Sequence, residues 1–147
     1  MDRPSWDEYF IKIAKLTSER SNCIKRKVGS IIVKNNRILS LGYNGTPSGV
    51  KNCYDGGCKR CFEQFNSKKE YKGKDLDLCL CLHAEENAML FISQNDLHDS
   101  TIYVTLFPCV SCVKKILQCK IKRICFIENA TISLLKENNI EVHQIFL

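Results

Sequence analysis

Long apolar runs are absent from this sequence of 147 residues. No stretch approaches the roughly 20 apolar residues that a helix needs to cross a bilayer, which excludes a membrane span. The segment from Met1 to Trp6 lacks the basic start and apolar stretch of a secretory signal. Internal repeats and low-complexity tracts are also missing, which excludes a repeat or fibrous architecture. We therefore expect one soluble, cytoplasmic domain that covers residues 1–147.

No charged tail stands out, although the chain is basic. Its 22 lysines and arginines exceed its 16 acidic residues and give a formal net charge of +6, with the excess spread along the chain. Basic runs usually form solvated faces, but a diffuse positive field also attracts anionic nucleotides. The charge alone does not separate a mononucleotide from RNA or DNA.

Cysteine is the residue in excess, with ten in the chain. In a secreted protein this number would indicate disulfides, whereas a reducing cytosol favours thiolates that bind metal. The cysteines are concentrated in a polar, glycine-containing stretch from about residue 45 to residue 82, which we interpret as a zinc-binding insertion in the domain.

The periodicity of apolar residues predicts an α/β fold. Ser5 can cap a first helix, and two branched-residue strands over 28–33 and 37–43 are joined by the turn residues Asn35 and Asn36. Helices and strands then alternate, with helices over 83–94, 109–118 and 132–138 and strands over 101–105, 123–127 and 140–146. This order predicts a three-layer α/β/α sandwich around a central mixed sheet of about five strands.

Two short motifs indicate a catalytic zinc site. His83 and Glu85 form an H-x-E motif, and Cys109 and Cys112 follow in a P-C-x-x-C motif. One imidazole and two thiolates fill three corners of a tetrahedron and leave the fourth for water, whose pKa the metal lowers. Glu85 lies close enough to carry protons between that water and a leaving amine. The motifs are typical of zinc hydrolases that deaminate a nucleobase.

The chain resembles the zinc-dependent cytidine and deoxycytidylate deaminase family over most of its length, and the deoxycytidylate deaminases in particular. The resemblance rests on the two zinc motifs together with the segments L-T-S-E-R-S-N-C at 16–23, K-V-G-S-I-I-V at 27–33, G-Y-N-G-T-P-S-G at 42–49 and T-L-F-P-C at 105–109. It implies a cytidine deaminase-like fold and hydrolysis of dCMP to dUMP and ammonia, which feeds thymidylate synthesis.

The resemblance also implies roles for individual residues. It assigns Asn44 to the sugar and Arg26, with Lys25 as a second candidate, to the 5′-phosphate. An arginine fork suits a phosphate better than an ammonium group does. The backbone N–H of Ala84 and the carbonyls around Thr105 are expected to hold the edge of the base. The family further implies a homo-oligomer, often a hexamer, with dCTP and Mg²⁺ or dTTP as effectors.

Six cysteines within the first 81 residues lie outside the catalytic motifs and predict at least one structural zinc. The resemblance ranks Cys23, Cys53 and Cys81 first, and the spacing of the remaining three adds Cys58, Cys61 and Cys79 as further candidates. Four ligands leave two thiols over and two complete sites need eight, so one site, two sites and a shared set all stay open. Cys119 and Cys125 have no cysteine partner nearby in sequence and are expected to be structural.

The sequence leaves alternatives to dCMP deamination, both other substrates and another class of protein. The alternatives are a deaminase of dCTP, of cytidine or of a nucleic-acid base, and a noncatalytic zinc-binding module. Nucleic-acid deaminases need stacking aromatic residues, and this chain has only one tryptophan and five tyrosines beside seven phenylalanines, several at apparent core positions. A purely structural zinc site closes with four protein ligands and has no use for a carboxylate such as Glu85.

Overall fold

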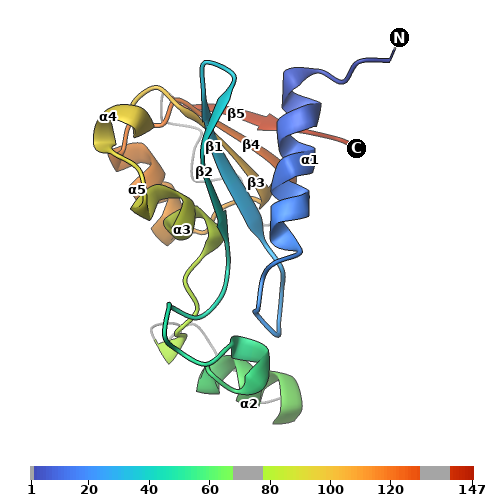
Figure 1. Ribbon diagram of the computed structural model, residues 1–147, viewed down its shortest axis with the longest axis vertical. Coiled ribbons are helices and arrows are strands. Elements are labelled where there is room, and N and C mark those ends of the chain that lie inside the picture. The colour runs from blue at the N-terminus through green and yellow to red at the C-terminus, as the bar shows by residue number, and fades with distance from the viewer. Residues whose placement is uncertain (1, 68–77, 130–139) are drawn as a thin grey trace.

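The structure is a computed structural model that describes residues 2–67, 78–129 and 140–147. Figure 1 shows the arrangement of its helices and strands. In chain order they are α1 (Trp6–Ser18), β1 (Gly29–Lys34), β2 (Arg37–Tyr43), η1 (Cys53–Asp55), α2 (Lys59–Ser67), α3 (Ala84–Leu90), α4 (Gln94–Leu97), β3 (Thr101–Leu106), α5 (Val110–Gln118), β4 (Arg123–Glu128) and β5 (Glu141–Gln144).

The five strands form one mixed sheet in the order β2-β1-β3-β4-β5. β1 pairs antiparallel with both β2 and β3, whereas β3, β4 and β5 run parallel. Ile102 of β3 lies between Ile32 of β1 and Ile124 of β4, so three branched side chains form a row across the centre of the sheet. The mixed five-stranded sheet predicted from the sequence is confirmed.

Helices cover both faces of this sheet and complete the three layers. α1 lies alone on one side in Figure 1, while α3, α4 and α5 lie on the other. On the α1 side, Phe10 and Ile11 pack in one buried cluster with Ile31. On the opposite side, Ile32 and Ile116 belong to a second cluster. Because successive strand residues point to opposite faces, Ile31 and Ile32 serve different cores.

Local signals explain most element boundaries. The Ser5 hydroxyl oxygen accepts a hydrogen bond of 3.1 Å from the Glu8 N–H and caps α1 as expected. Asn35 and Asn36 both have positive φ, 52° and 58°, as a tight turn with left-handed residues between antiparallel strands requires.

Several expected boundaries differ in the structure. The helix expected over 83–94 ends at Leu90, and a separate short helix that was not expected, α4, begins at Gln94, where Ser93 accepts a hydrogen bond from the Asp96 N–H. The last strand is shorter than expected, and α2 was not predicted at all. The helix expected over 132–138 lies outside the described residues.

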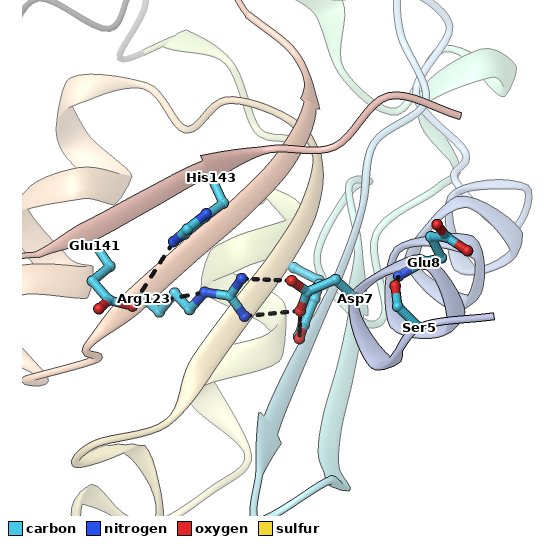
Figure 2. Close-up of polar contacts among 7 residues, drawn as sticks. Ser5, Asp7, Glu8, Arg123, Glu141 and His143 are labelled. Carbon is cyan, nitrogen blue, oxygen red and sulfur yellow. Dashed lines mark hydrogen bonds and ion pairs between the residues drawn. The ribbon is translucent and has the colours of Figure 1, made fainter.

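An ion-pair network ties α1 to the parallel half of the sheet (Figure 2). Asp7 accepts two hydrogen bonds from the Arg123 guanidinium, at 2.8 and 2.5 Å, and a third of 2.7 Å from the Tyr103 hydroxyl. The bond from Arg123, more than any other interaction, holds the pKa of Asp7 below its usual value. Two residues of β5 extend the network, because Glu141 Oε2 lies 3.9 Å from Arg123 Nε and 3.9 Å from His143 Nε2.

None of the helices in the described ranges combines the length and the apolar character that crossing a membrane requires.

Candidate active site

Two helix N-termini bring together the three ligands expected for a catalytic zinc. His83 immediately precedes α3, Cys109 immediately precedes α5, and Cys112 lies in the first turn of α5. The Nδ1 atom of His83 lies 3.4 Å from Cys109 Sγ and 3.3 Å from Cys112 Sγ. The three ligand atoms all lie within 4.8 Å of one another. Residues that are 29 positions apart in sequence therefore meet at one point.

The spacing of these three atoms fits a tetrahedral zinc ion. Zn–N and Zn–S bonds of about 2.0 and 2.3 Å place neighbouring ligand atoms roughly 3.5–3.8 Å apart. Hydrogen bonds from Cys112 and then His83 lower the pKa of the Cys109 thiol to about 4, so Cys109 is a thiolate at neutral pH, the form that binds zinc. Three protein ligands leave the fourth position for water, the arrangement of a catalytic rather than a structural site.

Glu85 is buried beside the three candidate zinc ligands and is only 4% exposed. Removal from water disfavours the charged carboxylate and is the main reason that the pKa of Glu85 is raised to about 7. At neutral pH such a group can both accept and donate a proton. Glu85 and His83 also line the same cavity, so the carboxyl group faces the space in which a substrate would react.

The cavity has a volume of about 390 Å³. Its walls are largely apolar and include Val28, Leu106, Phe107 and Val113. Sequence reasoning missed these four residues as site residues, although three of them lie within four positions of Cys109 and the fourth follows the basic run at 25–27. An apolar cleft with a few polar groups is the usual form of a small-molecule site, and apolar walls suit the faces of a planar base.

Asn44 lines the cavity, but it also organises one wall of it. Its Oδ1 atom accepts hydrogen bonds from the Val28 N–H at 2.8 Å and the Ser21 hydroxyl at 2.6 Å. Its Nδ2 atom donates to the Arg26 carbonyl at 2.7 Å. Among the described residues its second amide hydrogen has no partner, which leaves it available to a ligand. Asn44 therefore fixes the backbone that carries Arg26 and Val28, a task that the sequence did not indicate.

The structure separates the two phosphate candidates. Arg26 lines the cavity, and its Nη2 atom forms an ion pair of 2.7 Å with Glu128 at the end of β4. Lys25 is not among the residues that line the cavity, and its Nζ atom donates to Gln64 of α2 at 2.5 Å. Only Arg26 therefore lies where it can meet a group that extends from the cavity.

The two residues expected to hold the edge of the base stand in different relations to the cavity. Ala84 is buried at the start of α3 and lines the cavity. Thr105 lies one position before the lining residue Leu106, and its hydroxyl accepts a hydrogen bond of 3.2 Å from the Gly29 N–H. The Thr105 side chain thus fastens β3 to β1, while the backbone that follows it forms the cavity wall.

The six remaining candidate ligands gather away from the cavity, near α2. Cys23, Cys53 and Cys81 lie together as expected, with Cys61 as the fourth member of the set. A second set also contains Cys61 and Cys81, and its other members are Cys58 and Cys79. Cys119 and Cys125 belong to no metal-binding group among the described residues.

A mixed sheet covered by helices on both faces, with an H-x-E and a C-x-x-C motif at two helix N-termini, has the features of the zinc-dependent deaminases. The sequence model of the cytidine and deoxycytidylate deaminase zinc-binding region matches residues 4–128, and the chain belongs to this family.

Individual relatives cover most of the chain. It is 45% identical to a deoxycytidylate deaminase of Schizosaccharomyces pombe over 97% of its length and 37% identical to one of Mycobacterium phage D29 over 86%. The aligned region is 44% of the S. pombe protein and 97% of the phage protein, so the chain spans less than half the length of the fungal relative.

A solved structure shares both fold and sequence with the chain. The dCMP deaminase of cyanophage S-TIM5, in its complex with dCMP and dUMP, superposes with a TM-score of 0.72 at 30% identity, and the match covers 99% of this chain and all of that one.

Proposed function

We propose that this chain catalyses the hydrolytic deamination of dCMP to dUMP and ammonia. The observation that carries the proposal is the buried Glu85 beside His83, Cys109 and Cys112 at the wall of one cavity. A noncatalytic zinc module would need neither this carboxyl group nor the cavity. The names of the fungal and phage relatives and the nucleotides in the S-TIM5 complex support dCMP as the substrate.

The chemistry follows from the position of Glu85. Zinc held by His83, Cys109 and Cys112 would supply a water molecule of lowered pKa at the fourth ligand position. The Glu85 carboxylate would accept one proton from the water that attacks C4 of the cytosine ring and would deliver this proton to N3. The same carboxyl group carries the second proton to the amino group. The C4–N bond then breaks, ammonia leaves, and C4 keeps the oxygen as the carbonyl of uracil.

The rest of the nucleotide would extend along the cavity toward its rim. Val28 and Phe107 offer apolar surface to the faces of the base, and the Ala84 N–H and the carbonyls near Thr105 would hold its polar edge. The free amide hydrogen of Asn44 would serve the sugar. Arg26 would bind the 5′-phosphate. Because its guanidinium pairs with Glu128, the phosphate must either share the guanidinium with Glu128 or displace the Glu128 carboxylate. Lys25 would contribute only if it left Gln64.

The proposal also covers the oligomeric state, the regulation and the cellular compartment of the protein. A homo-oligomer, with a hexamer as the first candidate, is supported by the exposed apolar side chains of Leu41, Leu90 and Phe91. Effector control by dCTP with Mg²⁺ and by dTTP rests on family resemblance. All ten cysteines are unpaired, which supports a reducing compartment, the cytosol.

Ammonia release measured on a panel of dCMP, dCTP, deoxycytidine, cytidine and a cytosine-containing single-stranded oligonucleotide tests the proposal. The expected result is the highest kcat/KM for dCMP. A higher value for dCTP would make the triphosphate the substrate, and release from the oligonucleotide would indicate a nucleic-acid deaminase. Zinc-loaded protein that releases no ammonia from any of the five would contradict the enzymatic assignment. Repeating the panel with dCTP or dTTP as effector tests regulation.

A further inference from the structure

Six cysteines near α2 form two sets of four that overlap. In one set the sulfur atoms of Cys23, Cys53, Cys61 and Cys81 all lie within 4.8 Å of one another, and in the other those of Cys58, Cys61, Cys79 and Cys81 do. Each set has the number and type of ligand that a closed structural zinc site requires. Both sets contain Cys61 and Cys81. The overlap therefore falls on two particular residues.

The overlap shows how six thiols can give each of two zinc ions four ligands. One zinc ion would leave two buried or half-buried thiols without a role, and two separate ions would need eight ligands. Two ions that share two ligands need six. We propose that the six cysteines hold a binuclear zinc cluster in which the Cys61 and Cys81 thiolates each bridge both ions. Cys23 and Cys53 then complete one ion, and Cys58 and Cys79 complete the other.

The measured separations agree with shared metal coordination. Cys79 Sγ lies 3.8 Å from Cys58 Sγ and 3.7 Å from Cys61 Sγ. Two sulfurs on one tetrahedral zinc lie roughly 3.8 Å apart, given a Zn–S bond of about 2.3 Å. A disulfide would bring two sulfurs to about 2.0 Å, and all six cysteines are unpaired. The sulfurs are thus spaced as ligands of a common ion.

Backbone N–H groups donate to two of the six sulfurs. The Ile24 N–H donates to Cys53 Sγ at 3.4 Å, and the Leu80 N–H donates to Cys58 Sγ at 3.3 Å. Such N–H donors orient metal ligands and stabilise their negative charge. Six thiolates and two zinc ions leave a net negative charge, and a basic run, Lys25 to Lys27, begins two positions after Cys23. Cys53, Cys58 and Cys61 are almost fully buried, which protects the cluster from solvent.

The cluster would also hold in place the backbone that carries two cavity residues. Cys81 precedes the active-site ligand His83 by two positions, and Cys23 precedes Arg26 by three. Leu82, which lies between Cys81 and His83 in the chain, exchanges two backbone hydrogen bonds with Gly45, of 2.8 and 3.2 Å. One bridging ligand is thus joined directly to the backbone of the active site. The proposal itself concerns metal binding and stands whether or not dCMP is the substrate.

Two measurements on the unaltered, metal-loaded protein test the cluster. Native mass spectrometry should give three zinc ions per chain, one in the active site and two in the cluster. After replacement by cadmium, NMR of the metal nuclei should give two resonances that are coupled to each other through the bridging sulfurs. A count of two zinc ions per chain would overturn the proposal, and so would two cluster resonances without mutual coupling.

A pair of variants tests the bridging assignment. Cys61→Ser removes a ligand of both ions, so the zinc count should fall from three to one, whereas the control Cys119→Ser should keep three. A count of two in Cys61→Ser would assign Cys61 to a single ion and overturn its bridging role. If Cys61→Ser does not fold, the cadmium spectrum of the unaltered protein still decides. Ammonia release plays no part in these readouts, so failure of the cluster and failure of the proposed reaction are distinguishable.

Discussion

Glu86 and Lys115 form an ion pair of 2.7 Å that joins α3 to α5. The other carboxylate oxygen of Glu86 accepts a hydrogen bond of 3.2 Å from the backbone N–H of His83. A single carboxylate thus fixes the backbone of one zinc ligand and anchors the helix that begins beside Cys109 and contains Cys112. The geometry of the three active-site ligands depends on this contact between two helices.

Loss of that contact should weaken the active-site zinc without unfolding the protein. Glu86→Ala removes both interactions, and we expect zinc affinity at the active site to fall by about tenfold, the lower end of what outer partners of metal ligands contribute. The chelator concentration that halves deaminase activity measures the effect. Lys114→Ala, an exposed neighbour of Lys115, is the control. Equal chelator sensitivity in Glu86→Ala and the unaltered protein would contradict the role.

Glu85→Gln should separate the fold from the chemistry. Glutamine is close in size and neutral, so it should fit the buried position and leave zinc content unchanged, but it cannot carry a proton. We expect kcat for dCMP to fall by about 10²–10⁴. Glu19→Gln, which removes an exposed carboxylate, should keep full activity. Near-normal turnover in Glu85→Gln would assign proton transfer to another group.

Arg26→Ala should affect nucleotides and nucleosides differently. If the guanidinium binds the 5′-phosphate, KM for dCMP should rise about tenfold while KM for deoxycytidine stays constant. Lys25→Ala is the matched control because its side chain bonds to Gln64 instead of lining the cavity. Steady-state kinetics on both substrates measures the difference. An equal loss on both would mean that Arg26 shapes the site through its bond to Glu128.

The parts of the fold that depend on local sequence could be predicted, and those that depend on distant contacts could not. Ser5 caps its helix through a residue three positions away, and the Asn35–Asn36 turn needs only its own backbone angles. The pair of Arg26 with Glu128 joins residues 102 positions apart, and no periodicity signals it. α2 was missed because its sequence is polar and its one cysteine, Cys61, looks like a metal ligand in a loop.

The candidate site shows the same division. The spacing of the two motifs is sufficient to predict His83, Glu85, Cys109 and Cys112, because each pair lies within one turn of a helix or next to its start. The division of the other cysteines could not be predicted, since six thiols allow several metal arrangements and only coordinates show which sulfurs lie close together. Likewise, three hydrogen bonds decide that Asn44 organises the cavity wall.

Gly42 of β2 packs against α3. A Cβ atom at this position would lie 2.3 Å from the Ala84 carbonyl oxygen and 2.5 Å from the Ala88 nitrogen. These are backbone atoms of α3, so Gly42→Ala should push the helix and Glu85 away from the sheet. We expect a loss of about 1–3 kcal/mol in the free energy of unfolding and a lower kcat. Ser40→Ala on the same strand should change stability by less than about 1 kcal/mol. Equal denaturation midpoints for both variants would contradict this packing.

The Asp7 network predicts a particular dependence of stability on pH. The pKa of Asp7 is lowered in the folded protein, chiefly by Arg123, so its contribution is complete above the pKa of the unfolded chain, about 3.9. The contribution is lost as the pH falls through the lower, folded pKa. Asp7→Asn should therefore reduce the free energy of unfolding by about 1–2 kcal/mol at pH 7, since the pair is partly exposed.

The difference between Asp7→Asn and the unaltered protein should then shrink in acid. At pH 7 and pH 5 it should be equal, because Asp7 is ionised in both the folded and the unfolded chain, and below about pH 3.9 it should decline. Urea denaturation at a series of pH values measures this, with Asp2→Asn at the exposed amino terminus as the control. A difference that stayed constant down to pH 2 would mean that Asp7 stabilises α1 by its shape rather than by its charge.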